Sequence, residues 1–286
     1  MRSMEITRDI AGTRAAVTTA RRNRRPIGFV PTMGYLHAAH LSLVEAARRD
    51  ETFVVVSIFV NPTQFGPNED LDRYPRDETG DLRKCESAGV DLVFIPPTSE
   101  MYPPGAATTV HVAGVTDTLC GPGRPGHFDG VATVVAKLFH IVQPDRAYFG
   151  EKDYQQLVVL RQMTRDLNLP IEVIGCPTLR EPDGLAMSSR NAMLSPNERE
   201  RALALNRSLK AARNRVRAGA RDSEVIIEEV RQVLLEADLD KAEYISVVDP
   251  ETLQPVARIN APVRIALAVR IGATRLIDNL SVDPDA

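Results

Sequence analysis

The chain has 286 residues, enough for one large domain or two modest ones. Hydrophobic residues make up 43% of it and charged residues 26%, which is typical of folded globular proteins and excludes a disordered chain. The formal net charge of −3 provides no overall basic field, so we expect neither nucleic acid nor an anionic membrane as a partner.

Cysteine use and hydropathy indicate the compartment. The three cysteines lie far apart and form no CxxC pattern, which is typical of a reducing compartment. No apolar run approaches the roughly 20 residues that cross a bilayer, and the first residues lack the apolar core of a secretory signal. We therefore expect a cytoplasmic protein.

Short β-branched or aromatic runs alternate with helical patterns over the first two-thirds of the chain. Because these strands are apolar on both faces, they predict a Rossmann-like parallel sheet flanked by helices, an α/β fold. The expected strands are 27–31, 53–60, 92–95, 146–149 and 171–175, and the expected helices are 40–49, 77–88, 130–142 and 153–168. Ligands bind such sheets at the carboxyl ends of the strands, so functional side chains should follow the strands directly.

The pattern changes after Pro177. Two long charged helices are expected at 196–218 and 223–237, followed by strands at 244–248, 263–269 and 274–279. This order predicts a smaller α+β domain. We expect residues 1–178 to form a Rossmann-like domain that binds nucleotide and substrate, and residues 179–286 to form a C-terminal lid domain.

Two histidines, His37 and His40, follow the first expected strand. At i and i+3 of a helix start they share one face. The unpaired N–H groups of the first helical turn suit a polyphosphate, and imidazole donors would stabilise the charge that develops as pyrophosphate departs. A metal pair, or histidines that only cap or pack, are the alternatives here. The position after a strand favours the nucleotide interpretation.

Amide and basic side chains occupy two further loops. Asn61 and Gln64 follow the second strand, where they could orient a small polar substrate, although Asn61 before Pro62 is equally typical of a turn. Arg124 and His127 lie in a glycine- and proline-rich loop that could hold a phosphate or carboxylate, or could be a structural turn.

Two other strings suit phosphate recognition. Lys152 follows the fourth expected strand as a point charge, beside Asp153, which could cap a helix or touch a ribose hydroxyl or magnesium. Gln156 comes one turn later on the same face. The loop 187–191 combines two hydroxyls with a guanidinium, and a mobile second domain could carry it over the nucleotide.

These motifs resemble known ones. The HxxH pair and the Met-Ser-Ser loop are similar to the HIGH and KMSKS signatures of the nucleotidyltransferase superfamily. Five longer strings, in the same order over nearly the whole chain, resemble the pantoate–β-alanine ligase family. They are PTMG from Pro31, FVNPTQF from Phe59, HFDGV from His127, FGEKDYQQ from Phe149 and MSSRN from Met187.

The resemblance implies a reaction in two halves. The carboxylate of (R)-pantoate attacks the α-phosphorus of ATP and gives pantoyl adenylate and pyrophosphate. The amine of β-alanine then attacks the acyl carbon and releases AMP and pantothenate. The resemblance also implies magnesium on the phosphates and a homodimer.

The resemblance assigns roles to individual residues. His40 would act as proton donor, and the catalytic set would be His40, His37, Lys152 and Arg190. Pantoate and β-alanine would be held by Gln64, with Gln156 and Asn61 as further substrate contacts. Asp81 is the expected magnesium partner, from its family position alone. The expected ATP-binding residues are Met33, Gly34, Tyr35, Leu36, His37, Ala38, Ala39, His40, Gly150, Glu151, Lys152, Asp153, Leu179, Met187, Ser188, Ser189 and Arg190.

The sequence departs from the family at Ala39, where the family has glycine, and at Leu179, where valine is expected. Glycine lets a ligand approach the backbone closely, so the Ala39 methyl group should affect ATP binding modestly. Another adenylyl-transferring enzyme and a non-catalytic nucleotide-binding module are the rival interpretations. A dehydrogenase is poorly supported, because no GxGxxG string follows the first strand.

Overall fold

The structure, a computed structural model, describes residues 4–67, 69 and 71–285. These residues form two compact units. The first contains the described residues up to Val112, with Arg124–Glu151 and Val159–Pro177. The second contains Ala113–Gly123, Lys152–Val158 and the described chain from Thr178 onward. Among the helices of the described ranges, none has the length and apolar character that a membrane crossing requires.

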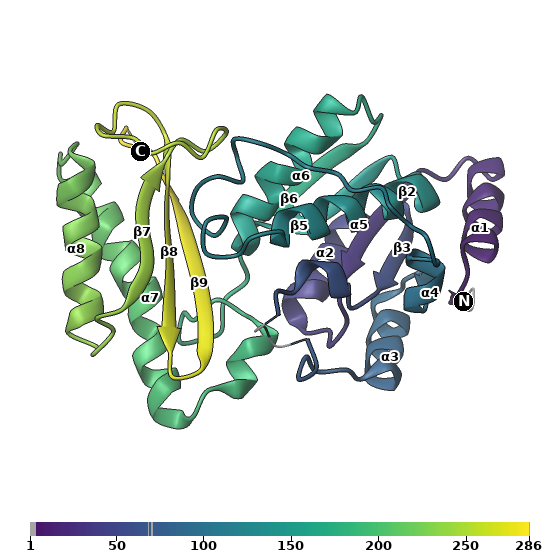
Figure 1. The fold of residues 1–286 in the computed structure, drawn as a ribbon, viewed down its shortest axis with the longest axis horizontal. Coiled ribbons are helices and arrows are strands. Elements are labelled where there is room, and N and C mark those ends of the chain that lie inside the picture. Colours follow the sequence, from purple (N-terminus) through teal and green to yellow (C-terminus); the bar gives the residue numbers. More distant parts are fainter. Residues whose placement is uncertain (1–3, 68, 70, 286) are drawn as a thin grey trace. The chain divides into compact units, whose positions relative to one another are not determined.

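The first unit is built on a six-stranded parallel sheet with the order β1-β4-β3-β2-β5-β6 (Figure 1). Its strands are β1 (Glu5–Thr7), β2 (Ile27–Thr32), β3 (Phe53–Ile58), β4 (Leu92–Phe94), β5 (Arg146–Gly150) and β6 (Glu172–Cys176). The predicted α/β fold is confirmed. The sequence did not reveal β1, because three residues with two exposed side chains carry no strand pattern.

Helices cover both faces of this sheet. Alternate residues of a strand point to opposite faces: Val30 belongs to a buried cluster with Leu43 of α2, whereas Phe29 packs edge-on against Phe139 of α5. The helices are α1 (Ile10–Arg22), α2 (Ala38–Arg49), α3 (Glu78–Ala88), α4 (Thr98–Met101), α5 (His127–Val142) and α6 (Tyr154–Asp166), with short 3₁₀ helices η1 (Pro62–Gln64) and η2 (Glu151–Asp153). The apolar strands are therefore buried from both sides, as predicted.

The strand order places three chain segments at one edge of the sheet. From β2 the chain moves to β3 and then β4, whereas β5 returns to the other side of β2. Because all six strands are parallel, the residues that follow β2, β3 and β5 leave the sheet at its carboxyl edge, at a topological switch point. His37, η1 and Glu151 follow these three strands respectively.

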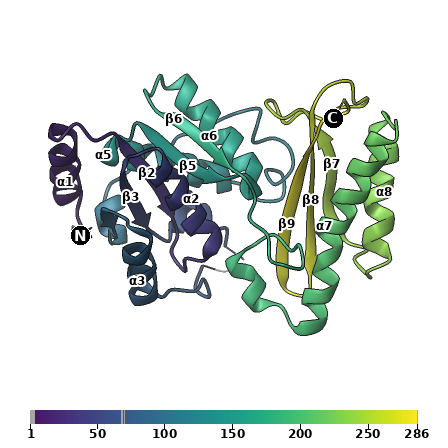
Figure 2. The same cartoon turned by 180° about the vertical axis from the view of Figure 1, so that it is seen from behind.

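The second unit contains an antiparallel sheet with the order β7-β8-β9. Its strands are β7 (Ala242–Val248), β8 (Val263–Ile271) and β9 (Thr274–Val282), and its helices are α7 (Pro196–Arg217), α8 (Ser223–Leu235) and the 3₁₀ helix η3 (Ser189–Met193). Figures 1 and 2 show α7 and α8 on one side of this sheet. The predicted α+β character of this part is confirmed.

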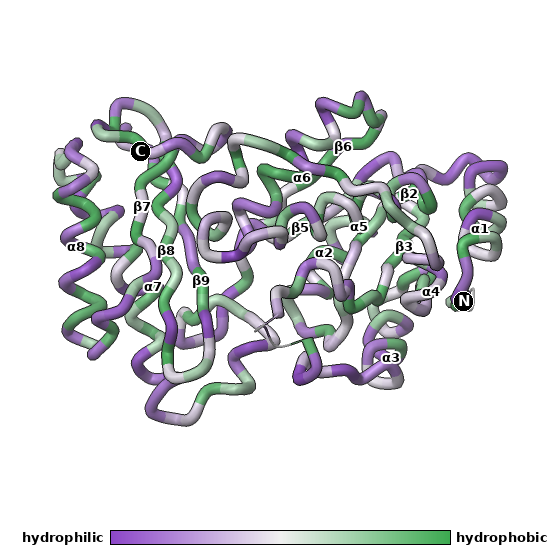
Figure 3. Tube along the Cα trace, viewed as in Figure 1, coloured by the Kyte–Doolittle hydropathy of each residue, from purple (hydrophilic) through white to green (hydrophobic). Residues whose placement is uncertain are grey.

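Helix α8 is amphipathic. Its trace changes repeatedly between hydrophobic and hydrophilic residues (Figure 3), as expected when one face of each turn is apolar. Ile226, Val230 and Leu234 fall on one face, at a spacing of four residues, and are completely or almost completely buried. They join Leu209 of α7 and Leu267 of β8 in one hydrophobic core.

Two short segments belong to the second unit although the chain on either side of them belongs to the first. The buried Gln155 side chain links them: its Oε1 accepts from Cys120 N at 2.9 Å, and its Nε2 donates to the carbonyls of Val115 and Thr118. The sequence offered no sign of this, because a glutamine in a helix is ordinarily a surface residue. The division into functional domains 1–178 and 179–286 stays a prediction.

Candidate functional site

The turn after β2 is held by one buried carboxylate. Gly34 and Tyr35 both have positive φ, at 82° and 52°. For a tyrosine this conformation costs about 1–2 kcal/mol. The Oδ2 and Oδ1 atoms of Asp81 accept from Tyr35 N and Leu36 N, each at 2.7 Å. Two charge-assisted hydrogen bonds thus compensate for the strained backbone.

The two histidines cap the start of α2. His37 is the N-cap residue, and its backbone N–H donates to Nδ1 of His40 at 3.3 Å. The backbone N–H of His40 donates to the backbone carbonyl of His37 at 2.8 Å, and the two ring centroids lie 4.2 Å apart. Because Nδ1 of His40 accepts a hydrogen bond, a neutral His40 ring carries its proton on Nε2.

The capping interpretation and the phosphate interpretation are therefore compatible at this turn. The cap uses Nδ1 of the His40 ring. The Nε2–H group on the other side of the ring is not used by the cap, so it could serve as a donor to a phosphate. Ala38 and Ala39 occupy the first two helical positions. Alanine has less backbone freedom than glycine, so Ala39 gives a more rigid helix start than a glycine would.

Asp81 does not fit as a metal ligand in this structure. Its side chain is only 1% exposed, both oxygens accept from the β2–α2 turn, and Lys84 Nζ lies 3.7 Å from Oδ1. Within the described ranges, no group of three or more histidine, cysteine, aspartate or glutamate side chains could hold a metal ion. Asp81 is thus a structural element of the turn.

Asn61 is wholly engaged in the protein. It is 1% exposed, its Oδ1 accepts from Tyr102 Oη at 2.9 Å, and its Nδ2 donates to Gly130 O at 3.1 Å and to Gln64 Oε1 at 3.2 Å. The turn interpretation of Asn61 therefore has the geometric support. Gln64 is half-buried, and its Nε2 lies 3.0 Å from Met33 Sδ, so the β3 loop reaches the β2 turn.

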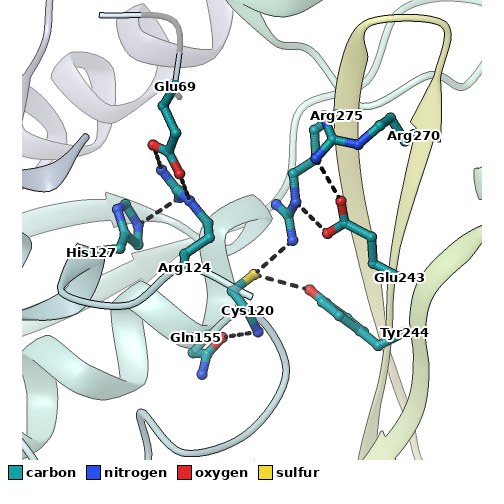
Figure 4. A network of polar contacts seen from close by, with 9 residues as sticks. All are labelled: Glu69, Cys120, Arg124, His127, Gln155, Glu243, Tyr244, Arg270 and Arg275. Atoms are coloured by element: carbon teal, nitrogen blue, oxygen red, sulfur yellow. Dashed lines mark hydrogen bonds and ion pairs between the residues drawn. The ribbon is translucent and has the colours of Figure 1, made fainter. Parts of the chain in front are cut away.

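Glu69, Arg124 and His127 form a chain of polar contacts (Figure 4), which ends at the backbone carbonyl of Gln64. Glu69 accepts two hydrogen bonds from Arg124, at 2.7 and 2.6 Å. Arg124 also lies 2.8 Å from Nε2 of His127, whose Nδ1 lies 2.8 Å from the carbonyl oxygen of Gln64. A guanidinium only donates and a carbonyl only accepts, so His127 is protonated on Nδ1 and accepts at Nε2. Arg124 is thus engaged with the protein, where the sequence left ligand contact open.

Lys152 lies beside the Met-Ser-Ser loop within the second unit. A small hollow there is lined by Lys152, Ser188, Asn191 and Asp278, among others. Ser188 caps η3 by accepting from Arg190 N at 3.2 Å, and Asn191 donates to Ala186 O. The structure therefore brings together the lysine of one predicted motif and the serine of another, 36 residues apart in sequence.

The remaining predicted residues are distributed as follows. Gly150 ends β5, and Glu151 and Asp153 lie in η2, while the half-buried Gln156 lies in the first turn of α6. Leu179 and Met187 are paired by a hydrogen bond from Met187 N to Leu179 O at 3.0 Å. Sequence reasoning missed Asp278 and Asn279, because a polar pair in a strand carries no signal of what it contacts.

A second polar cluster in Figure 4 involves Cys120, Tyr244 and Arg275 of the second unit. Cys120 Sγ lies 3.2 Å from Tyr244 Oη and 3.4 Å from Arg275 Nη2, and Arg275 also pairs with Glu243 at 2.7 Å. Burial, together with the neighbouring thiol, raises the pKa of Tyr244 well above its ordinary value. The cluster joins the 113–123 segment to the β7–β9 sheet.

Comparison with known proteins identifies relatives over almost the whole chain. The model of the family described as pantoate-beta-alanine ligase matches residues 5–281. The pantothenate synthetase of Moorella thermoacetica is 52% identical over 280 residues, covering 98% of this chain and 99% of its own length. That of Desulfitobacterium hafniense (strain DSM 10664 / DCB-2) is 55% identical over 276 residues, covering 96% and 98%.

Solved structures are similar as well. The crystal structure of pantothenate synthetase from Thermus thermophilus superimposes with a TM-score of 0.92 at 51% identity, covering 97% of this chain and 99% of that one. Pantoate-beta-alanine ligase from Francisella tularensis, complexed with beta-gamma ATP and beta-alanine, gives a TM-score of 0.80 at 35% identity and covers 99% of both chains.

The Asp81 contacts generate a first prediction. In Asp81→Asn the amide nitrogen cannot accept, so one backbone N–H of the turn loses its buried partner. We expect the free energy of unfolding to fall by about 1–3 kcal/mol, measured by urea denaturation with circular dichroism because the chain has no tryptophan. Glu86→Gln, at an exposed position of the same helix, is the control. Equal stability of the two variants would contradict this role of Asp81.

The Glu69–Arg124 pair generates a second prediction, on pH. The hydrogen bond from Arg124 lowers the pKa of Glu69 below its ordinary value of 4.5. The ionised carboxylate therefore contributes stability above pH 4.5, and this contribution is lost as the pH falls through the lowered pKa. We expect Glu69→Gln to be less stable than the wild type at neutral pH and the gap to narrow in acid, as followed by thermal unfolding. For the exposed control Glu200→Gln we expect the difference in stability from the wild type to be independent of pH. The same result for Glu69→Gln would refute the stabilising role of the ionised Glu69.

Proposed function

Because the chain belongs to the pantoate–β-alanine ligase family, we propose that it uses ATP to join pantoate to β-alanine, releasing AMP and pyrophosphate. The observation that carries the proposal is the family match over residues 5–281. The chemistry of the β2–α2 turn agrees with it, since a histidine pair stands at a helix N-terminus that suits an anion.

In the first half-reaction, a carboxylate oxygen of pantoate attacks the α-phosphorus of ATP. A new carbonyl–O–P linkage forms, the bond to the β,γ-phosphates breaks, and pyrophosphate leaves with its electron pair. Such a displacement needs little covalent chemistry from the protein, so placement and charge stabilisation supply the rate. The motif residues suit this task, because they offer N–H, ammonium, guanidinium and hydroxyl donors.

In the second half-reaction, the amine of β-alanine attacks the acyl carbon. The new C–N bond forms, the C–O bond to AMP breaks, and the amine loses a proton. The adenylate is a mixed anhydride that water would hydrolyse, so the reaction requires exclusion of water.

We assign the proton-donating role to His40. Its Nδ1 accepts in the α2 cap, which places its proton on Nε2 and fixes the ring plane. A donor held in one orientation stabilises developing charge on a phosphate oxygen without reorganising during the reaction. His37, which shares the cap, is assigned to the same phosphates.

We assign Lys152, Ser188, Ser189 and Arg190 to the phosphates as a second set, together with the backbone of Gly150 to Asp153, Leu179 and Met187. Support comes from Lys152 and Ser188 lining one small hollow, which makes their two segments neighbours in the second unit. Phosphate oxygens accept hydrogen bonds from ammonium, hydroxyl and N–H donors of the kinds that these segments carry. Magnesium would arrive with ATP as part of that substrate, since Asp81 is engaged in the turn.

We assign the organic substrates to Gln64 and Gln156. Gln64 is held at its backbone and at its side chain. His127 contacts its backbone carbonyl, and Asn61 and Met33 contact its side-chain amide. A neutral amide held in this way can recognise a hydroxyl or carboxylate by direction as well as by charge. Asn61 then acts by orienting Gln64. A homodimer is a further part of this proposal and rests on the resemblance alone.

The test is incubation of the protein with ATP, magnesium, pantoate and β-alanine, with AMP and pantothenate followed by mass spectrometry. Exchange of labelled pyrophosphate into ATP should require pantoate and proceed without β-alanine. Pyrophosphate exchange that proceeds equally well without pantoate would favour a different adenylyl-transferring enzyme. ATP binding without AMP release under any of these conditions would favour a nucleotide-binding module.

The assigned roles generate a third prediction. His40→Ala and Lys152→Ala should each lower kcat by about 10²–10³-fold, because each removes a donor to the departing phosphates, while circular dichroism stays like that of the wild type. The matched control is His140→Ala, at an exposed position in the last turn of α5. Wild-type turnover in His40→Ala or Lys152→Ala would refute the role of the residue concerned.

A further inference from the structure

Two adjacent residues of β9, Asp278 and Asn279, hold two separate parts of the second unit. Both side chains are buried, at 2% and 5% exposed, although both are polar. Burying such groups is costly unless they are fully hydrogen-bonded. The identity of their partners therefore shows what the pair stabilises.

Asp278 holds the hairpin that leads into the Met-Ser-Ser loop. Its two oxygens accept from Arg180 Nη1 and Nη2, at 2.7 and 2.9 Å. Arg180 also donates to Gly184 O, and it pairs across the hairpin with Ala186. The bidentate geometry fixes the guanidinium plane. The chain that continues into Ser188 is thereby tied to β9.

Asn279 holds the backbone of Lys152. Its Nδ2 donates to Lys152 O at 2.9 Å, and its Oδ1 accepts from Arg264 Nη1 at 3.1 Å. The Arg264 guanidinium in turn lies 3.7 Å above the ring of Tyr154. The backbone at and just after Lys152 is thus fixed, and only the flexible side chain of the lysine is left to adjust.

The position of β9 explains how one dipeptide reaches both segments. Neighbouring side chains of a strand point to opposite faces of the sheet, and β9 is an edge strand. Asp278 therefore binds the hairpin that contains Arg180, and Asn279 binds the segment that contains Lys152. The two segments meet beside that edge. Lys152, Ser188 and Asp278 line the same hollow there. The pairing with Arg180 also neutralises a carboxylate that would otherwise repel phosphates.

We propose that Asp278 and Asn279 are positioning residues, which set the placement of the Lys152 ammonium relative to the Ser188–Arg190 loop for binding the phosphates of ATP. This inference rests on the proposed function and deepens it. Neither residue touches substrate in this proposal. Each acts through a segment that does.

The test compares Asp278→Asn and Asn279→Ala with Val230→Ala, a core truncation in α8 that destabilises the same unit without touching the network. Misplacing a binding group by about 1 Å costs on the order of a hundredfold in rate. We expect each network variant to raise KM for ATP at least about tenfold while leaving KM for β-alanine close to that of the wild type. Val230→Ala should lower the melting temperature and leave both KM values unchanged.

Two further measurements keep the test decisive. Hydrogen–deuterium exchange of Asp278→Asn without ligand should accelerate over residues 179–191, which a purely global loss of stability would not single out. Arg180→Lys keeps the positive charge but loses the two guanidinium nitrogens that donate to Asp278. It should therefore raise KM for ATP in the same way, and it replaces Asp278→Asn in the test if that variant fails to fold. Calorimetric titration with ATP compares the Kd values of the same variants in the absence of turnover.

The possible results separate the two claims. A wild-type protein that makes no AMP from ATP, pantoate and β-alanine would count against the proposed function, while ATP titration of the variants would still test the positioning. If the wild type is active and the network variants behave like Val230→Ala, with unchanged KM for ATP and no local exchange, the positioning role is overturned. An equal rise of KM for all substrates would overturn it too.

Discussion

Where β2 ends, the chain leaves a parallel sheet through a turn whose backbone N–H groups have no strand to pair with, and Asp81 supplies the partners. Its carboxylate accepts from Tyr35 and Leu36 inside the protein, where an unpaired N–H would be costly. Those two bonds fix the direction in which α2 begins. The hydrogen bonds between His37 and His40 lie at that point, so the geometry of the histidine pair depends on a carboxylate 41 residues beyond His40 in the chain.

Charged residues repeat this supporting role elsewhere in the molecule. Arg124 is engaged by Glu69 and Arg180 by Asp278, each through two hydrogen bonds. A guanidinium in a glycine-rich loop suggests a ligand contact, yet its five donors serve equally well to fix a loop when a carboxylate lies opposite. In both cases the arginine holds a neighbouring segment that carries a group assigned to the reaction. Gln64 is that group in the first case, and Ser188 is in the second.

The boundary between the two compact units falls within the FGEKDYQQ string that begins at Phe149. Gly150 and Glu151 belong to the first unit, whereas Lys152 and the residues up to Val158 belong to the second. Polar contacts link these residues to the rest of the second unit: Asn279 donates to the Lys152 carbonyl, and Gln155 accepts from Cys120 in the 113–123 segment. The lysine is therefore placed by the β7–β9 sheet, although only Glu151 separates it in the chain from the end of β5.

The sequence by itself determined the class of fold, the order of most elements and the family, because hydrophobic periodicity and the contiguous strings of the motifs are local properties of the chain. It also identified His40, Gln64 and Lys152 as groups to examine, since each follows a strand of a parallel sheet. Only the tertiary structure showed which groups of the protein lie opposite Asn61, Asp81 and Arg124, and that Asp278 and Asn279 bond to two separate segments. The reason is physical: a polar side chain has the same donors and acceptors whether it meets a ligand or the backbone, and only folding determines which one lies opposite.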